Sequence, residues 1–378
     1  MQFKTNLFYL KVKCPVGCEY CFEDTNNEMV QKYDLQKMFK TFDSMIRKGE
    51  FNRITLHGGD VLSLPIEDFR YICEEFARRN TGISVQTSLA FLTDEHIDLI
   101  KKYHIGIGIS VDGPPELNIF RGPRDPNLNK IYQQNLLSNI NRLRKNKIPF
   151  GSISILTKHN ATGENLDKLC EWVAKEKING RFNPMFTPHF DNRMVYQELT
   201  PEELKNAWIR LYYVAKENPS LPISPVREFI DNLLGLGLKS CVVTRCDYIN
   251  TRCNTILPDG GIGRCDRCFQ DGYYYSSENS TLNRSEILKS TECKGCRYWE
   301  VCGGACPGEG IDKDYRRKSR FCEAYYGFYS FLEKEIRGLL PNVILSIDIE
   351  NYYDEYFLKE RKLNWPHDMG YSTYHKRR

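Results

Sequence analysis

Apolar and polar positions alternate along the first half of the chain in a way that predicts strands followed by helices. Short apolar runs, each the length of one strand, precede longer stretches whose apolar residues recur every three or four positions. The expected strands are Asn6–Val12, Arg53–Leu56, Ile83–Thr87, Ile105–Val111, Ser152–Leu156 and Arg181–Phe186. The expected helices are Asp34–Arg47, Glu67–Arg79, Asp94–Tyr103, Ile131–Arg144, Asn165–Lys175 and Pro201–Lys216.

These six uninterrupted β-then-α units indicate an α/β fold built on a parallel sheet, either open or closed into a barrel. The strands are nearly continuous apolar runs, as expected when helices cover both faces of the sheet. In such folds the functional groups collect at the carboxyl ends of the strands. We therefore look for chemistry in the segments that follow each strand.

The pattern changes after about Leu221. From Ser240 to Cys322 there is little periodicity, and Cys, Gly, Asp and Arg dominate. This composition is typical of a loop-rich module held together by metal rather than by an apolar core. A further helix is expected at Ala324–Arg337, followed by a polar, aromatic tail that either docks on the body or is solvated.

Charge and hydropathy exclude several function classes. The net charge of +4 arises from 53 basic and 49 acidic residues, which is too small an excess to indicate binding to nucleic acid or to an anionic membrane. The N-terminus lacks the apolar segment of a signal peptide. No run of about 18 apolar residues is present to span a bilayer. We expect a cytoplasmic protein.

Cysteine is strongly over-represented. The chain has 15 cysteines, and ten of them lie between Cys241 and Cys322. In a reducing compartment, clusters of this kind bind metal more often than they form disulfides. A disulfide-stapled secreted module is the alternative, but the chain is large and carries no secretion signal.

Three cysteines follow the first expected strand as Cys14-x3-Cys18-x2-Cys21. Cubic iron–sulfur clusters normally take four cysteine ligands, so three thiolates would leave one iron with an open position, as catalytic metals have. The alternative from spacing alone is a zinc site that takes its fourth ligand from elsewhere.

This run, CPVGCEYCF, resembles the CxxxCxxC motif of the radical S-adenosylmethionine (SAM) superfamily, with Tyr20 in the aromatic position. The resemblance implies a 4Fe–4S cluster on Cys14, Cys18 and Cys21, with SAM bound at the open iron. It implies reductive cleavage of SAM and abstraction of a hydrogen atom from the substrate. The protein then positions and shields the reacting groups.

Later strand ends carry further parts of this resemblance. Gly58-Gly59-Asp60 is similar to the segment that meets the amino group of SAM, although Asp60 stands where the family has Glu and Val61 where it has Pro. The shorter Asp side chain leaves backbone carbonyls as the main partners of that amine, and an ordinary tight turn is the alternative. The resemblance places Ser110 near the ribose and Arg121 near the carboxylate of SAM. Phe186 is a candidate contact for the adenine, with simple core packing as the alternative.

A second cysteine set, with the string CKGCRYWEVCGGAC, resembles the SPASM module of radical SAM maturases. Eight thiolates saturate two 4Fe–4S clusters. The resemblance assigns one auxiliary cluster to Cys246, Cys253, Cys265 and Cys306, and the other to Cys293, Cys296, Cys302 and Cys322. Cys241 and Cys268 are alternative ligands for the first cluster, zinc is an alternative at Cys293–Cys306, and Cys73 and Cys170 are expected to be buried hydrophobes.

The resemblance also suggests a role for Asp266, which directly follows Cys265. In the sulfatase-maturating branch an Asp at this place acts as a general base, and a substrate radical that loses an electron must also lose a proton. A solvent-facing Asp in a turn is the alternative.

The expected architecture is a partial (β/α)6 TIM-like barrel at 1–225, a loop-rich iron–sulfur SPASM domain at 226–340 and a C-terminal tail at 341–378. The expected enzyme modifies a peptide or protein, either as a maturase of ribosomal peptides by cross-link, thioether or epimerisation, or as a formylglycine-forming oxidase of sulfatases. A flavodoxin- or ferredoxin-type donor supplies electrons. Either the barrel mouth binds the substrate directly or a separate peptide-recognition protein delivers it.

Two other classes remain as alternatives, namely a non-catalytic zinc-binding module and an iron–sulfur electron carrier without SAM chemistry. The sequence does not specify the residue attacked, the type of modification or the oligomeric state.

Overall fold

The computed structural model describes residues 5–10, 14, 16–21, 33–46, 52–185, 187, 193–236, 253–263, 280–314 and 316–352. The chain divides into two compact units. The N-terminal unit consists of Lys4–Ser154 with Cys253–Gln270, and the C-terminal unit consists of Met1–Phe3, Ile155–Arg252 and Asp271–Arg378. Within the described ranges, no helix is both long enough and apolar enough to cross a membrane.

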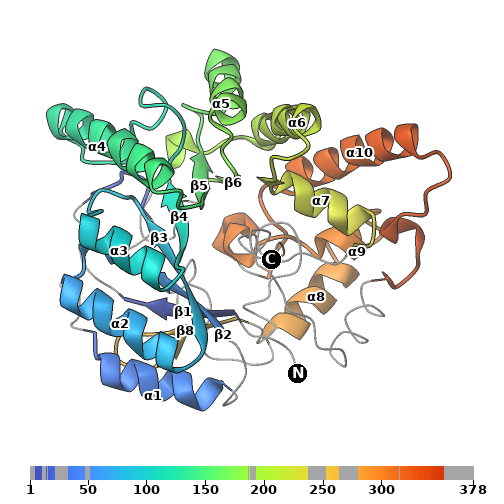
Figure 1. Cartoon of the computed structure of the whole chain (residues 1–378). Helices are drawn as coiled ribbons and strands as arrows, with labels where there is room; N and C mark the ends of the chain where they lie inside the picture. The colour runs from blue at the N-terminus through green and yellow to red at the C-terminus, as the bar shows by residue number, and fades with distance from the viewer. Residues whose placement is uncertain are drawn as a thin grey trace. The chain divides into compact units, whose positions relative to one another are not determined.

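The N-terminal unit is a parallel sheet with helices in its crossovers (Figure 1). Its strands lie in the order β5-β4-β3-β2-β1-β8-β9, and among these described strands the pair β8–β9 is antiparallel while the others pair in parallel. The strands are β1 (Thr5–Tyr9), β2 (Asn52–His57), β3 (Thr81–Thr87), β4 (Gly106–Ser110), β5 (Phe150–Leu156), β8 (Cys253–Ile256) and β9 (Ile262–Gly263). The helices are α1 (Leu35–Met45), α2 (Ile66–Arg78), α3 (Asp94–Lys102) and α4 (Pro126–Lys145). The predicted α/β fold with parallel strands is confirmed.

An aromatic cluster joins the first strand to its helices. The ring of Phe8 on β1 lies 5.2 Å from Phe39 of α1 and 5.1 Å from Phe76 of α2, measured between centroids. All three side chains are at most 3% exposed. Burying a side chain of this size contributes roughly 1.5–3 kcal/mol, so this contact fixes the strand whose end leads into Cys14.

The C-terminal unit contains α5 (Gly163–Glu176), β6 (Gly180–Pro184), α6 (Pro201–Glu217), β7 (Ile223–Ser224) and α7 (Val226–Leu233), followed by α8 (Ser280–Ser290), α9 (Trp299–Cys302) and α10 (Cys322–Leu339). Strands β6 and β7 pair in parallel. The buried Trp208 of α6 and Phe229 of α7 lie 5.2 Å apart between ring centroids, and Tyr329 of α10 lies 4.6 Å from Phe229. This cluster holds α10, the helix that begins at Cys322, against α6 and α7.

The segment after α10 docks on the same unit. Leu345 is fully buried, and the hydroxyl of Ser346 donates to the carbonyl oxygen of Asn232 at 2.7 Å. The described part of the predicted tail, up to residue 352, is therefore packed at Leu345 and Ser346, whereas residues 353–378 lie outside the described residues. The predicted domain boundaries stay a prediction.

Candidate cofactor site and cysteine pocket

The loop after β1 carries Cys14, Cys18 and Cys21, all three half-buried and none of the three in a disulfide. The backbone N–H of Cys21 donates to the carbonyl of Cys18 at 3.2 Å. The N–H of Glu19 donates to the carbonyl of Phe120 at 2.9 Å, which ties the cysteine loop to the segment after β4. The structure therefore places the three thiols beside the segment that contains Arg121.

The electrostatics of this loop suit a bound cation. Burial and the neighbouring Asp60 raise the pKa of Cys14 to about 12. Burial also raises the pKa of Cys18, which Arg121 opposes, and the other two cysteines raise it further. A cationic centre would remove this penalty, because thiolates are the metal-binding form of cysteine.

The donor set fits a cluster with several irons. In a cubane each thiolate binds its own iron, so the sulfur atoms do not converge on one point.

Beside Cys18, a buried carboxylate links two of the residues expected at the site. Arg121 Nη2 donates to Asp112 Oδ1 at 2.9 Å, and the hydroxyl of Tyr20 donates to Asp112 Oδ2. The guanidinium carbon of Arg121 lies 5.4 Å from the centre of the Tyr20 ring, within the range of a cation–π contact. Burial opposes the charge of Arg121, but Asp112 and Tyr20 keep its pKa well above the usual value.

A polar network behind Asp112 was not predicted from the sequence. The N–H of Asp112 donates to Asn118 Oδ1 at 2.7 Å, and Asn118 Nδ2 donates to Gln133 Oε1 at 2.8 Å. Gln133 Nε2 donates to the carbonyl of Arg121 at 3.1 Å. Satisfied buried networks of this kind fix side chains in one arrangement, so α4 holds Asp112 and Arg121 in place.

Gly58 and Gly59 form the turn after β2, with φ of +98° and +57°. A Cβ at Gly58 would lie 2.7 Å from the carbonyl oxygen of Leu10. The same backbone is tied by a hydrogen bond from the N–H of Leu10 to the carbonyl of His57 at 2.7 Å. Only glycine combines this conformation with such a close approach.

Asp60 is 1% exposed and accepts hydrogen bonds from four groups of the protein. Its Oδ1 accepts from the N–H of Leu62 at 3.0 Å and from the hydroxyl of Thr87 at 2.8 Å. Its Oδ2 accepts from the N–H of Ser88 at 2.8 Å and from the hydroxyl of the same residue. A carboxylate offers about four acceptor positions, so these contacts occupy it, and contact with a cofactor stays a prediction for this residue.

Ser110 lies at the end of β4, half-buried, and its hydroxyl accepts a hydrogen bond from Gln86 Nε2 at 2.9 Å. Gln86 lies on the neighbouring strand β3 and was not singled out in the sequence. Its long polar side chain, one residue before the end of a strand that precedes the one carrying Ser110, is the signal that could have identified it.

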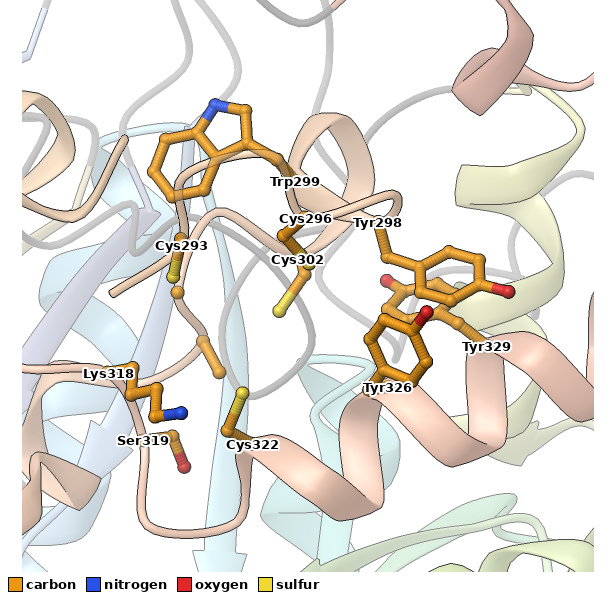
Figure 2. Close-up of a pocket in the computed structure, with 12 residues that line it drawn as sticks. Cys293, Cys296, Tyr298, Trp299, Cys302, Lys318, Ser319, Cys322, Tyr326 and Tyr329 are labelled. Carbon is orange, nitrogen blue, oxygen red and sulfur yellow. The ribbon is translucent and has the colours of Figure 1, made fainter. Parts of the chain in front are cut away.

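The C-terminal unit brings four cysteines around one pocket, which holds about 370 Å³ of empty space, part of it open to solvent. Cys293 and Cys296 lie after α8, Cys302 ends α9 and Cys322 begins α10. Figure 2 shows the sulfur atoms of Cys302 and Cys322 pointing into the same space. The structure thus brings these four thiols together, although they span 30 positions of the chain.

The backbone around this pocket explains how the thiols gather. The N–H of Cys293 donates to the carbonyl of Leu288 at 2.8 Å, and the N–H of Cys302 donates to that of Tyr298 at 2.8 Å. Arg284, which is 4% exposed, donates to the carbonyl of Gly304 at 2.8 Å. Burial and then the neighbouring thiols of Cys322 and Cys296 raise the pKa of Cys293 to about 11, so this pocket too suits a bound cation.

Several expected site residues cannot be placed. Phe186, Cys246, Cys265 and Asp266, with the alternative ligands Cys241 and Cys268, lie outside the described residues. Cys253 is described only through its backbone, which pairs with Thr5 at the start of β8. Cys306 is buried and is not among the residues that line the four-cysteine pocket.

Comparison with known proteins identifies the class. Residues 9–173 match the model of the radical SAM superfamily. The chain is 20% identical over 379 residues to a serine-type anaerobic sulfatase-maturating enzyme from Bacteroides thetaiotaomicron, covering 85% of this chain and 89% of that protein. Residues 9–173 are thus a radical SAM domain, the protein is an enzyme, and the predicted resemblance is confirmed. The radical SAM fold implies one 4Fe–4S cluster and SAM.

Solved structures share the fold. The structure titled native anSMEcpe with bound AdoMet and Cp18Cys peptide aligns with a TM-score of 0.71 at 17% identity, over 91% of this chain and 100% of that one. Streptococcus suis SuiB bound to precursor peptide SuiA aligns with a TM-score of 0.57 at 13% identity, over 84% of this chain and 75% of that one. Both of these neighbours are complexes with peptides.

Proposed function

We propose that the protein is a radical SAM maturase that takes a hydrogen atom from a residue of a peptide or protein substrate. The observation that carries the proposal is the placement of Cys14, Cys18 and Cys21 beside the paired Tyr20, Asp112 and Arg121, within a radical SAM domain. The peptide complexes of two structural neighbours support a peptide substrate.

In this proposal Cys14, Cys18 and Cys21 hold the cluster. When bound, the cluster and SAM supply a one-electron cleavage that generates a radical able to abstract hydrogen from carbon. Arg121, oriented by Asp112, contributes positive charge for the carboxylate of SAM, and Ser110 contributes a hydroxyl for its ribose. Asp60 holds the glycine turn, whose backbone carbonyls are left to meet the amine.

We further propose that Cys293, Cys296, Cys302 and Cys322 hold one auxiliary 4Fe–4S cluster, and Cys246, Cys253, Cys265 and Cys306 a second. These clusters would take up the electron that a substrate radical loses, while Asp266 accepts its proton. The grouping of four thiols in the pocket supports the first assignment. A flavodoxin- or ferredoxin-type donor and a cytoplasmic location complete the proposal.

The decisive experiment uses the full chain, reconstituted anaerobically and supplied with SAM and dithionite. We expect 5′-deoxyadenosine, and about twelve irons per chain if three cubanes form. Replacing Cys14, Cys18 and Cys21 by Ala should abolish the product while about eight irons remain. Continued SAM cleavage in this variant would overturn the proposal, and a zinc-only or iron-only protein without SAM cleavage would establish one of the alternatives.

The reaction type can be separated with peptides labelled with deuterium at Cα or Cβ of a Cys or Ser. Deuterium transfer to 5′-deoxyadenosine identifies the carbon attacked. A hydrazide-reactive aldehyde would establish formylglycine formation, which the sulfatase-maturating relative favours. Loss of two hydrogens without an aldehyde would establish a cross-link, and gain of one deuteron from D2O at unchanged composition would establish epimerisation.

A further inference from the structure

The buried hydroxyl of Tyr132 on α4 has no hydrogen-bond partner among the residues that the structure describes. The residue is 6% exposed. Leaving such a group unsatisfied in the interior costs roughly 1–3 kcal/mol, so a native structure that retains one requires an explanation. A ligand that binds at this place would provide the missing partner.

Other polar side chains near Tyr132 on α4 are hydrogen-bonded to the loop after β4. Asn129 Nδ2 donates to the carbonyls of Ile119 and Pro123, each at 2.9 Å. Gln133 is bound to Asn118 and to the carbonyl of Arg121. The side chains on either side of Tyr132 thus hold the loop after β4, and its own hydroxyl makes no hydrogen bond to that loop.

The ring of Tyr132 packs against the backbone next to Arg121. Gly122, the next residue in the chain, has φ of +139°, and a Cβ there would lie 2.8 Å from Tyr132 Cδ1. A bare glycine is therefore required to let the ring approach the backbone at this place. Burial raises the pKa of Tyr132 well above its usual value, as does the nearby Cys18, while Arg121 opposes the increase.

Arg121 also has an unsatisfied donor. Its Nη2 donates to Asp112, but its buried Nε finds no partner in the described part of the chain. Among the described residues, two buried groups that can donate thus lack a partner, one on Arg121 and one on the tyrosine whose ring packs against Gly122. The loop that carries Arg121 and Gly122 is itself hydrogen-bonded to the cysteine loop. A guanidinium N–H together with a hydroxyl forms a complement for an oxyanion, and among the parts of SAM only the carboxylate has this character.

We propose that the hydroxyl of Tyr132 and Nε of Arg121 donate hydrogen bonds to the carboxylate of bound SAM. This inference rests on the proposed function and adds Tyr132 as a cofactor-binding residue. It also accounts for the free hydroxyl, because the partner is present only when SAM is bound.

The test compares Tyr132→Phe with the wild type by equilibrium dialysis of labelled SAM against the full chain carrying its clusters. We expect SAM to bind about tenfold more weakly, the equivalent of roughly 1.4 kcal/mol. Decarboxylated SAM should bind both proteins equally, because it lacks the group that the hydroxyl contacts. No loss of SAM affinity, or an equal loss with both compounds, would overturn the inference.

Thermal unfolding without SAM gives a second test, in which the variant should not be impaired although its SAM affinity is lower. Removing an unpaired hydroxyl should leave the melting temperature of Tyr132→Phe unchanged or raise it, whereas a lower value would show a structural partner and refute the role. Tyr212→Phe is the matched control, because its hydroxyl donates to Glu335 at 2.8 Å in the other unit. It should lose stability and keep full SAM affinity. Failure of the wild type to bind any SAM would refute the proposed function itself.

Discussion

Asp60 receives two hydrogen bonds from a single residue, Ser88: one from its backbone N–H at 2.8 Å and one from its hydroxyl. Because Asp60 follows β2 and Ser88 follows β3, this pair joins the carboxyl ends of two neighbouring strands. The carboxylate of Asp60 thereby links the two loops that follow β2 and β3 beside the expected cofactor site. Because Asp60 directly follows Gly59, these hydrogen bonds also fix the C-terminal end of the turn Gly58-Gly59.

Asp60→Asn tests how much the hydrogen bonds of the Asp60 carboxylate stabilise the fold. An amide nitrogen cannot accept hydrogen bonds, so two of the four donors lose their partner, and we expect the free energy of unfolding to fall by about 2–4 kcal/mol. Asp34→Asn is the control, because Asp34 caps α1 at the surface and Asn caps a helix equally well. Urea unfolding of both variants checks the prediction, and a loss below about 1 kcal/mol in Asp60→Asn would contradict it.

The four-cysteine pocket is tested by Cys302→Ala. We expect iron to fall by about four atoms per chain, while SAM cleavage persists because the N-terminal triad is intact. Cys170→Ala is the matched control, since Cys170 is 5% exposed within α5. Unchanged iron in Cys302→Ala would show that this pocket holds no cluster.

His96 gives a prediction for acid stability. Burial lowers its pKa from 6.5 to about 4, so the unfolded chain binds a proton below pH 6.5 that the folded protein refuses until about pH 4. Stability therefore falls as the pH drops through this window, by about 2–3 kcal/mol from this group. The effect is absent above pH 6.5.

His96→Gln should remove this loss. Thr93 and His96 form a capping box at the start of α3, with the N–H of Thr93 bound to Nδ1 at 3.2 Å, and Gln serves the same role in such boxes. We expect equal stability at pH 7 and a shallower decline between pH 6.5 and 4. Urea unfolding at several pH values measures it, with the exposed His104→Asn as control for the change in charge.

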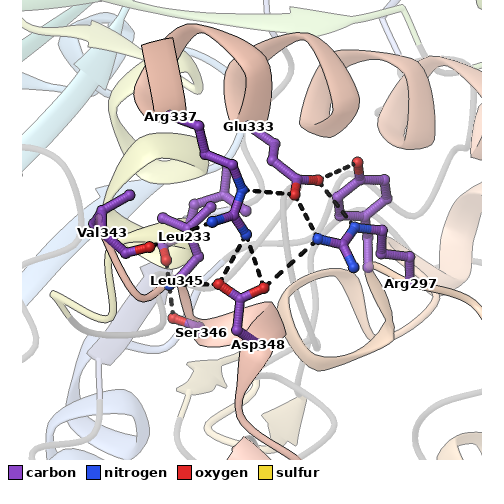
Figure 3. Close-up of polar contacts among 9 residues, drawn as sticks. Leu233, Arg297, Glu333, Arg337, Val343, Leu345, Ser346 and Asp348 are labelled. Carbon is purple, nitrogen blue, oxygen red and sulfur yellow. Dashed lines mark hydrogen bonds and ion pairs between the residues drawn. The ribbon is translucent and has the colours of Figure 1, made fainter. Parts of the chain in front are cut away.

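Glu333 organises the ion pairs that hold the end of the described chain (Figure 3). It accepts hydrogen bonds from Arg297 and Arg337, both at 3.0 Å for the Nε donors, and Arg337 in turn binds Asp348 at 2.8 Å. The hydrogen bond from Arg297 is the main cause that lowers the pKa of Glu333 to about 2.

We expect Glu333→Gln to lower the free energy of unfolding by about 1–2 kcal/mol at pH 7. The lowered pKa means that the contribution is complete above pH 4.5 and is lost as the pH falls towards 2, so the difference from the wild type should shrink there. Glu202→Gln, at an exposed pair with Lys205, should destabilise the protein much less than Glu333→Gln does, because solvent screens the pair. A pH-independent difference would contradict the account.

The local pattern of apolar and polar residues was enough to predict most strands and helices of the N-terminal unit. The expected strand Ile83–Thr87 is found as Thr81–Thr87, and the expected helix Asp94–Tyr103 as Asp94–Lys102. Strand β8 was missed because its four residues lie in a cysteine-rich segment and pair with a strand far away in the sequence. Helix α8 was missed because STLNRSEILKS does not repeat its apolar residues on one face.

The sequence located the cysteine loop and Arg121 because their spacing is distinctive, but it did not indicate Tyr132 or Gln133. The expected helix began at Ile131, whereas α4 begins at Pro126. A buried polar side chain such as Gln133 interrupts the apolar face of its helix, so the periodicity of the sequence predicts that it faces solvent. Their partners become visible only when the loop after β4 folds back on the helix.

The pairing of β1 with β8 imposes an order on biosynthesis. Thr5 and its neighbours leave the ribosome long before their partners, which begin at Cys253. During translation one edge of β1 is consequently bare, and bare edges recruit strands from other molecules. Nascent chains stalled before Ile256 should therefore aggregate more readily and depend more on chaperones than chains that include β8.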